Sequence, residues 1–441
     1  MSWPFNHILD RVFRPVRKRQ IEAGGGGRRW EGAGVLQAPQ QQTLAARGAA
    51  KARAAAAVMN NPLANRIVEV WGATLGKSWQ VCPQHPDVFV RKALAAQFEE
   101  LIRPILLQTA RALVRDGEAF VHLIVPSDGP LRAKLIASDQ VDPTLTRDLG
   151  NGGRIVAGVE FDAEDRIVAY HVLREAPGSP FAFFGEPVRV PAVDMLHIFD
   201  PLFPGQVRGL TWLAPVLLRL RDRDEASDAL LMQLKVAAMM TGFIRDPDGS
   251  LAEMMGAESN GALNLSLEPA MMRILPQGAD VTFSSPGAGL AQTAEFLRGI
   301  DRDIATGMGL TFEMLTGDLG EANYSSARVG LLDFRRRAEM LQRNLIEAGF
   351  LRPLWRRWIE VQGLAGAIPP EAMADHLAVR FVPPGWAWVD PQNEVAADVA
   401  AINAGLKSRE EVVAGRGRDI DELDEERARD KAQNIKGENH E

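Results

Sequence analysis

The longest continuous helical pattern in this 441-residue chain runs from about residue 325 to 361. Apolar residues recur there at steps of three and four, among them Leu341, Leu345 and Trp355. At 1.5 Å per residue, a straight helix of this length would extend roughly 50–55 Å. Pro353 should bend it, because proline removes a hydrogen bond and its ring clashes with the preceding turn. Such a helix is unusual in a compact enzyme domain and predicts an extended architecture.

The part of the chain before this helix predicts an α+β domain. Helices are expected over about 43–58, from Pro62 with Asn61 as its cap, and over about 86–116. Between 117 and 199 the period shifts to two, in the runs EAFVHLIV, LRAKLIAS, RIVAGVEFD and RIVAYHVL. The stretch VEFDAEDRIVAY predicts a hairpin with Asp162 to Asp165 as its turn. These strands should therefore be antiparallel.

Helical patterns return at 210–243 and 291–309, with short strands between them and a closing glycine after the second. Near the C-terminus, Asp390-Pro391 opens one short helix, and Ser408 with Glu411 predicts a capping box for another. The last dozen residues are expected to be frayed. Residues 1–50 predict a flexible arm, because stretches such as AGGGGRRWEGAG are poor material for a core.

Composition limits the class of protein. Apolar residues make up 46% of the chain and charged residues 24%, which is typical of a globular protein. The single cysteine, Cys82, excludes an internal disulfide framework and suits a reducing compartment. No apolar run reaches the length of a membrane span. The first twenty residues are basic and weakly amphipathic without a signal-peptide pattern, so a solvated arm is favoured there over a membrane-surface helix.

The net charge of −7 and the pI of about 5.7 argue against a protein that grips DNA over a broad surface. They do not exclude a protein that surrounds DNA without holding it. Contacts to phosphate groups are what bind a duplex non-specifically. A conduit through which DNA slides therefore benefits from having few of them.

The strongest resemblance to a nucleotide site is GATLGKS, from Gly72 to Ser78. A phosphate-binding P-loop needs four residues between its first glycine and the Gly-Lys pair, and this stretch has three. A helical segment also precedes it where a strand is required. The favoured interpretation is a glycine that ends a helix, with Lys77 in solvent.

The remaining chemistry-bearing residues predict no catalytic or metal site. Asp222, Asp224 and Asp228 alternate with arginines on a helical pattern, which favours a solvated or intersubunit ion-paired face over a metal site. The histidines are scattered, and those in strand contexts are expected to be hydrogen-bonded structural residues. Neither a Gly-x-Ser-x-Gly elbow nor an activated environment for Cys82 is present. The three histidines in strand contexts are His122, His171 and His197.

A glycine-containing loop feeds the long helix in LTGDLGEANYSSARVGLLDFRRR, residues Leu315 to Arg337. Such a loop often binds phosphate, but here the lysine, the spacing and a preceding strand are all missing. Ser325 or Ser326 is expected to cap the helix. The three arginines at 335–337 point in three directions, so a solvated or ion-paired face is favoured over a DNA contact.

Several of these stretches resemble the lambda-type portal proteins of tailed bacteriophages. The most specific are HIFDPLFPGQVRGLTWLAPVL and GDLGEANYSSARVGLLDFRRR. Others are RRWEGAG, NNPLANRIVEV, DGEAFVHLIV, GVEFDAEDRIVAYHVLRE, ILPQGADVTFSSP, RPLWRRW and AGLKSREEVVAGRG. The resemblance covers nearly the whole chain, although the C-terminal region is short for the family.

The resemblance implies a non-enzymatic protein without a cofactor. It would form a ring, typically of twelve subunits, at the unique vertex of the capsid. Double-stranded DNA would pass through this ring during packaging and ejection. The implied partners are other copies of the chain, the large terminase subunit, the major capsid or scaffold protein and head-tail connector proteins, with no membrane during packaging. The implied location is the virion, and the host cytoplasm during assembly.

The fold implied is α+β and ring-forming, with a wing, a stem, a clip and a crown. The wing is expected over 51–209 after the arm at 1–50, and stem helices over 210–243 and 291–310 with a strand-rich clip at 244–290 between them. A tunnel loop at 311–324, a long kinked helix with the wing return at 325–389, and a crown with an acidic tail at 390–441 complete the chain.

The resemblance also implies site residues. The tunnel-loop residues expected to face DNA are Gly317, Asp318, Leu319, Gly320, Glu321, Asn323 and Tyr324. Arg298, Arg302 and Arg328 are candidates for channel or intersubunit contacts, and ion pairing of the first two with the neighbouring Asp301 and Asp303 is slightly favoured over DNA contact. Two other hypotheses stay open: a nucleotide-dependent enzyme using GATLGKS, and a membrane-surface protein using the basic arm.

Overall fold

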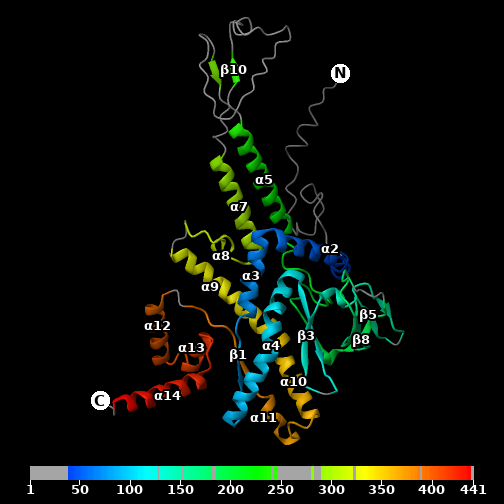
Figure 1. Cartoon of the computed structure of the whole chain (residues 1–441), viewed down its shortest axis with the longest axis vertical. Helices are drawn as coiled ribbons and strands as arrows, with labels where there is room; N and C mark the ends of the chain where they lie inside the picture. Colours follow the sequence, from blue (N-terminus) through cyan, green and yellow to red (C-terminus); the bar gives the residue numbers. More distant parts are fainter. Residues whose placement is uncertain are drawn as a thin grey trace, which may run out of the picture.

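The structure is a computed structural model that describes residues 38–438, except 128, 151, 181–184, 240–242, 246–279, 283–289, 321–323 and 388–389. The molecule is elongated (Figure 1). A two-helix hairpin projects from one end of a mixed helix and strand body, and three C-terminal helices lie at the side of the body away from its larger sheet. The long helix therefore belongs to an extended architecture, as its length predicts.

Three helices form the first part of the body: α2 (Pro39–Asn60), α3 (Pro62–Gly76) and α4 (Val88–Asp116). The Asn61 side chain accepts a hydrogen bond from the backbone of Ala64, so the predicted cap is confirmed. α4 ends at Gly117, whose φ of 86° is left-handed and favours glycine at this position.

Two antiparallel sheets follow. The first has the order β3 (Arg132–Ile136), β2 (Glu118–Ile124) and β9 (Met195–Phe199). The second is a meander of β4 (Arg147–Asp148), β5 (Arg154–Val156), β6 (Val159–Phe161), β7 (Ile167–Val172) and β8 (Val188–Pro191). The predicted hairpin is confirmed as β6 and β7, and Asp165 in its turn has a φ of 62°.

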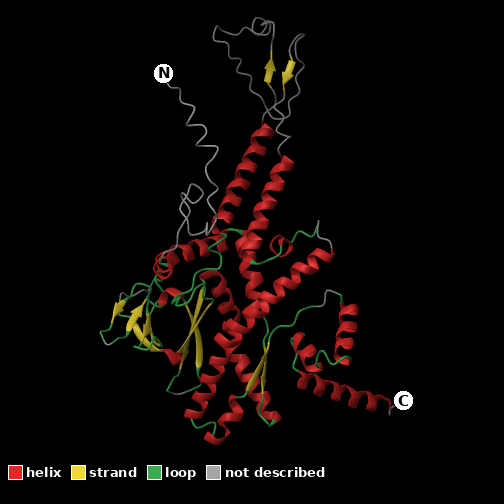
Figure 2. Ribbon diagram, turned by 180° about the vertical axis from the view of Figure 1, so that it is seen from behind, coloured by secondary structure: helices red, strands yellow, loops and turns green. Residues whose placement is uncertain are grey.

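The projecting hairpin consists of α5 (Leu217–Met239) and α7 (Leu290–Met308), which pack along each other (Figure 2). α5 begins seven residues later than expected, because residues 211–216 form turns that are bonded to the body, including Trp212 N–H to the Val114 carbonyl. Strands β10 (Phe243–Arg245) and β11 (Asp280–Thr282) pair between the two helices. The rest of the expected clip lies outside the described residues.

The long helix is present but is not a regular α-helix throughout. It begins as α9 (Tyr324–Leu341), widens into a π-helical segment (Gln342–Leu351) and continues as α10 (Arg352–Leu364). Pro353 lies in the first turn of α10, directly after the π-helical segment. The wider turn leaves room for the proline ring and tolerates its missing backbone N–H, so the helical path continues through this residue. A short helix, α8 (Phe312–Thr316), was not expected from the sequence.

After α10 the chain forms α11 (Met373–Leu377) and β12 (Val379–Val382), which pairs with β1 (Gln80–Pro83). The C-terminal helices are α12 (Pro391–Asn403), α13 (Arg409–Gly415) and α14 (Ile420–Glu438). Asp390 and Ser408 cap the first two, as predicted. The expectation of a frayed tail was wrong, since α14 continues to Glu438. Short 3-10 turns lie at Ser138–Gln140, Ala192–Asp194 and Pro370–Ala372.

One large core joins α3, α4, the base of the hairpin and the long helix. Its aromatic centre includes Phe98 and Trp355, with ring centroids 5.0 Å apart, and the fully buried Trp71. A smaller core lies around Phe120 and Tyr170, between the two sheets. Among the described residues, no helix has the length and apolar character needed to cross a membrane.

Candidate functional site

The loop after α8 is tied to the hairpin by an ion pair. Arg298 on α7 lies with its Nη2 atom 3.3 Å from Oδ2 of Asp318. The other carboxylate oxygen of Asp318 accepts a hydrogen bond from Gly320 N–H at 3.0 Å. Gly317 ends α8 in the left-handed conformation, with a φ of 75°. One carboxylate therefore shapes the turn and also links it to α7.

Two further arginines hold α8. The Arg302 guanidinium on α7 lies 5.6 Å from the ring centroid of Phe312. Arg66 on α3 donates through Nε to the Met314 carbonyl oxygen at 3.0 Å. Arg302 also lies 3.9 Å from Glu295 on its own helix. Ion pairing of Arg298 and Arg302 is thus present within one chain, with Asp318 and Glu295 as partners. The expected partners, Asp301 and Asp303, pair with Arg223 and Arg219.

The other predicted loop residues are placed as follows. The Leu319 side chain is 71% exposed and lies on the loop surface with Gly320. Glu321 and Asn323 lie outside the described residues, and Tyr324 is described only as the first residue of α9. The predicted capping by Ser325 or Ser326 concerns side chains that are likewise not described. Arg328 lines a shallow groove between α9 and α12.

The three consecutive arginines on α9, at 335–337, have separate environments. Arg335 donates to the Ala387 carbonyl oxygen at 2.8 Å and lies 5.4 Å from the centroid of the Trp386 ring. Arg337 lies 5.6 Å from the centroid of Trp71. Arg336 is exposed. Each of the three arginines therefore has a different environment, because three consecutive residues on a helix point in three different directions.

The acidic residues of α5 have polar partners at the base of the hairpin. Asp224 accepts two hydrogen bonds from Asn61 Nδ2, at 2.9 and 2.8 Å. Asp222 lies 3.6 Å from Arg219. Across the hairpin, Arg223 pairs with Asp301 on α7 at 3.1 Å. These partners support the interpretation of an ion-paired face. Among the described residues, no group of three or more His, Cys, Asp or Glu side chains is arranged to hold a metal ion.

The GATLGKS stretch forms the end of α3, and its glycines serve helix packing. A Cβ atom at Gly76 would lie 2.8 Å from the Leu107 Cα atom, and one at Gly72 would lie 2.9 Å from Arg111 Cγ. Lys77 follows the last turn and is exposed. The interpretation of a helix end with a solvated lysine is confirmed, and the geometry contains no phosphate-binding loop.

A buried ionic centre was missed in the sequence. Glu118, the first residue of β2, and Arg208 are both wholly buried, and Arg208 Nη2 lies 2.7 Å from Glu118 Oε1. Arg47 from α2 pairs with the same carboxylate, and His197 Nε2 from β9 lies 3.2 Å from its Oε2 atom. Arg208 also donates to three backbone carbonyls, those of Ser138, Val141 and Ala157.

This centre joins elements that are far apart in the sequence: α2, both sheets and the segment that leads into α5. Burial alone would raise the pKa of Glu118, but Arg208, His197 and Arg47 together outweigh it and hold that pKa well below its usual range. Burial lowers the pKa of His197, so its ring is neutral near pH 7 and donates to Glu118. Both Glu118 and Arg208 lie inside stretches that resemble the portal family. The signal available in the sequence was Glu118 itself, a single charged residue at the start of an apolar run.

Of the three strand histidines, two are hydrogen-bonded as predicted. His197 bonds to Glu118, and His171 Nε2 lies 2.8 Å from Oε2 of Glu160. His122 is half-buried on β2, and burial lowers its pKa.

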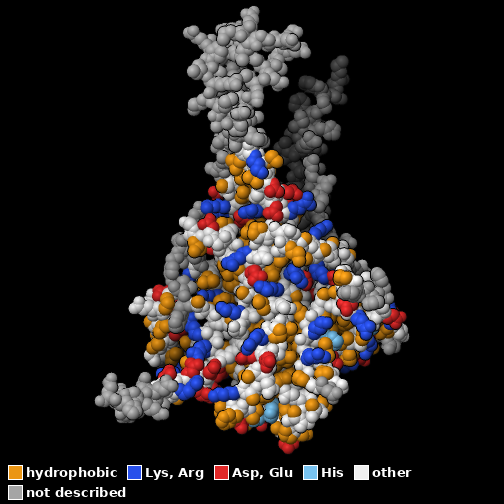
Figure 3. Space-filling model, viewed as in Figure 1, with side chains coloured by type: hydrophobic (Ala, Val, Ile, Leu, Met, Phe, Trp, Pro, Cys, Tyr) orange, Lys and Arg blue, Asp and Glu red, His pale blue; other side chains and the backbone are white. Residues whose placement is uncertain are grey.

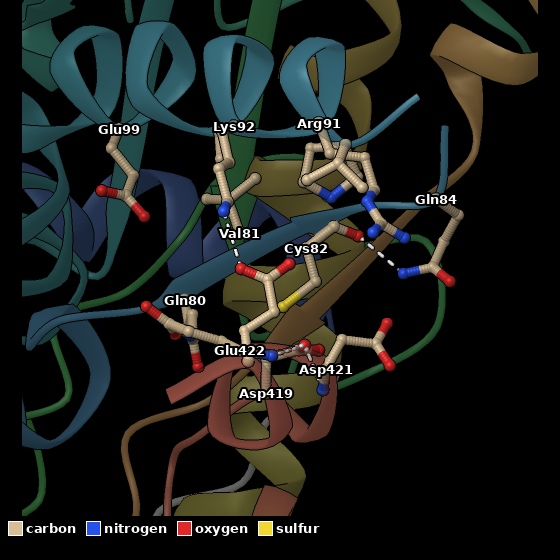
Figure 4. A pocket seen from close by; sticks show the side chains of 14 residues that line it. Gln80, Val81, Cys82, Gln84, Arg91, Lys92, Glu99, Asp419, Asp421 and Glu422 are labelled. Carbon is tan, nitrogen blue, oxygen red and sulfur yellow. Dashed lines mark hydrogen bonds and ion pairs between the residues drawn. The ribbon is translucent and has the colours of Figure 1, made fainter. Parts of the chain in front are cut away.

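A pocket separates the start of α14 from β1 and α4 (Figure 4). Cys82 points into it toward Asp419, and Lys92 Nζ on α4 lies 2.6 Å from Oε2 of Glu425 on α14. Burial, together with Asp419, raises the pKa of the Cys82 thiol, so the thiol is neutral and unreactive. Acidic and basic side chains pair across this pocket, which identifies it as the place where the C-terminal helices meet the body.

On the face of the molecule that Figure 3 shows, the exposed charges do not form a single basic patch. Figure 3 shows Lys and Arg side chains spread over one face of the body and interleaved with acidic and apolar ones. A protein that grips DNA would gather its cations on one surface. The visible face lacks such a gathering.

Comparison with known proteins agrees with the resemblance in the sequence. A profile described as "Phage portal protein, lambda family" matches residues 26–342. The chain is 31% identical over 324 residues to the probable portal protein of Halomonas phage phiHAP-1, covering 70% of this chain and 62% of that protein. It is 25% identical to portal protein B of Escherichia phage lambda, covering 62% and 57% of the two chains. The chain thus spans little more than half the length of these curated relatives.

Among solved structures, a chain from the neck of an empty GTA particle, computed with C6 symmetry, aligns with a TM-score of 0.48 and 19% identity. The alignment covers 86% of this chain and 92% of that one. The matched profile begins at residue 26, before α2, and ends at residue 342, directly after α9, so it includes both sheets, the hairpin and the loop at Asp318. The chain belongs to the lambda family of phage portal proteins.

Proposed function

We propose that this chain is the subunit of a ring, of about twelve copies by analogy with its family, at the unique vertex of a phage capsid. Double-stranded DNA passes through the ring during packaging and ejection. The observation that carries the proposal is the family match over 26–342, since portal proteins are structural proteins of the virion. On this basis α5 and α7 form the stem, and α12 to α14 form the crown.

The loop at Asp318 is proposed to face the DNA. It connects the stem to the long helix, and its described tip presents the apolar Leu319 beside an acidic residue that is already paired. Such a surface offers few contacts to phosphate, so it lets a duplex slide. Arg298 and Arg302 belong to the same surface but are engaged with protein groups in one chain. In this account they hold the loop rather than the DNA.

The ring is also proposed to be a docking platform. The large terminase subunit occupies it during packaging, and head-tail connector proteins replace the terminase afterwards. The major capsid or scaffold protein surrounds the wing. The proposed location is accordingly the virion, and the host cytoplasm during assembly.

Electron microscopy of the purified chain tests this function. Rings with a central hole are expected. A strictly monomeric and monodisperse protein at high concentration would contradict the proposal. The nucleotide-dependent alternative finds no support in the geometry at Lys77. ATP binding that is lost in Lys77→Ala would be needed to revive it.

A further inference from the structure

The C-terminal module, residues 390–438, has no core of its own in its described part. Among the described side chains, Val382 is the last buried apolar one, and the one buried side chain described in the module is that of Asp419. Its helices span 13, 7 and 19 residues. Helices this short are marginal in water without tertiary packing. The module therefore depends on surfaces outside itself.

Its described links to the body are mostly polar. Arg380 on β12 pairs with Glu410 and Asp419, and Lys92 pairs with Glu425. In the segment that leads into the module, Trp386 donates through Nε1 to Oε1 of Glu339 on α9 at 2.9 Å. The pairs of Glu410 and Glu425 are exposed, and such pairs typically contribute about 0–1 kcal/mol each, while the Asp419 carboxylate is buried. These links position the module but leave its apolar side chains uncovered.

The apolar side chains of α12 and the turn after it form a stripe, which we call the α12 stripe. It consists of Val395, Val399, Ile402 and Leu406, at steps of four, three and four. Three of the four are large exposed apolar side chains, with exposures of 41%, 51% and 79% for Val395, Val399 and Leu406. For the three members on α12 this is the spacing of a helix face that packs on another helix, and Leu406 follows in the turn after Gly405, whose φ is 71°.

A second stripe of the same length lies on α9, which we call the α9 stripe. It consists of Val329, Leu332, Arg336 and Met340, and its apolar members are 46–68% exposed. Basic residues outnumber acidic ones on α9, whereas acidic residues outnumber basic ones in the C-terminal module. The two surfaces are thus complementary in length, apolar character and charge.

Within one chain the two helices border a shallow groove, lined by Arg328, Leu331, Leu332 and Arg335 from α9 and by Glu394 from α12. Both stripes stay exposed there. We propose that the α12 stripe of one copy packs on the α9 stripe of a neighbouring copy, and that this contact completes the C-terminal module. The inference rests on the proposed ring. A contact between two different surfaces is the kind that closes rings of identical subunits.

Pairwise cross-linking tests the contact directly. The variant carrying Leu332→Cys and Val399→Cys would be assembled and treated with a short bis-maleimide. A ladder of covalent oligomers is expected on denaturing gels, with each single variant staying monomeric. Leu332→Cys combined with Leu364→Cys is the matched control, because Leu364 is 83% exposed and lies outside both stripes. The buried Cys82 should not react.

Hydrogen–deuterium exchange on intact rings gives a second readout. Val399→Asp should speed exchange in 391–415 at least tenfold while Leu364→Asp leaves it unchanged. If the parent protein forms no ring, the proposed function itself fails, and the inference falls with it. If rings form but give neither a ladder nor faster exchange, the inference alone is overturned. The inference is likewise overturned if the cross-link closes within single chains. It is also overturned if deleting residues 1–37 speeds exchange in 391–415 as much as Val399→Asp does.

Discussion

Arg208 and Glu118 form a wholly buried ion pair at 2.7 Å, and this pair joins the two sheets to the segment that leads into α5. Three backbone carbonyls share the same guanidinium. Removing this guanidinium would leave the buried carboxylate with only its weaker set of partners, Arg47, His197 and the Gly209 N–H, and would leave the three carbonyls without this donor.

Replacing Glu118 should strongly destabilise the chain. Glu118→Gln leaves the Arg208 charge buried and unpaired, and breaking a buried pair in this way costs about 3–5 kcal/mol. Urea unfolding followed by circular dichroism measures the change. Glu69→Gln is the control, since Glu69 pairs with Arg111 at 2.7 Å on the surface, where a loss of less than about 1 kcal/mol is expected. Equal effects of the two substitutions would contradict this account.

The same centre predicts a loss of stability in acid. Burial lowers the pKa of His197 in the folded chain, and unfolding returns it to about 6.5. Below that pH the unfolded chain binds a proton that the folded chain does not, so stability falls as the pH drops from about 6.5 toward the folded pKa. The pKa of Glu118 is also lowered by folding, so a second loss begins below about 4.5.

Urea unfolding at a series of pH values from about 7.5 down to about 3 would measure both steps. Each proton taken up on unfolding contributes a slope of about 1.4 kcal/mol per pH unit. His197→Gln keeps a donor toward Glu118 and should remove most of the upper slope. The pKa of His122 is lowered as well, so His122→Gln is a necessary comparison. An unchanged slope in His197→Gln would exclude His197 as its source.

The sequence predicted helices and hairpins well where the pattern itself decides the outcome. The cap at Asn61, the turn at Asp165 and the helical path through 324–364 follow from local chemistry. The centre at Glu118 was missed because its four side chains come from residues 47, 118, 197 and 208, and no local pattern brings these together. Likewise, the wide turns before Pro353 depend on tertiary packing, which periodicity does not record.

Helix packing explains the glycines of the apparent nucleotide motif. Gly76→Ala would place a Cβ atom 2.8 Å from the Leu107 backbone, so α3 and α4 would have to separate. A loss of about 1–3 kcal/mol is expected for this overpacking. Gly48 lies inside α2 with open space around it, and Gly48→Ala should instead stabilise the chain by about 0.5–1 kcal/mol. Thermal unfolding of the two variants should shift in opposite directions.

The pairing of Arg298 with Asp318 predicts separate effects on assembly and on DNA handling. Both side chains are partly exposed, so the pair should contribute less than about 1 kcal/mol to folding. Asp318→Asn keeps an oxygen acceptor for Gly320 N–H and removes the charge that holds the loop to α7. Rings of normal stability are therefore expected, in which the loop is no longer held at the stem.

Deleting residues 318–323 removes the loop tip together with this link. Because the stem and the long helix lie outside the deletion, rings should still assemble. If the loop faces DNA, the yield of packaged genomes or their retention should fall severalfold, with a smaller fall in Asp318→Asn. Glu164→Asn is a control for the loss of one exposed carboxylate, because Glu164 lies on the turn between β6 and β7, in the second sheet. Normal packaging by the deletion variant would show that the loop does not act on the DNA, while failure to form rings would assign it to assembly instead.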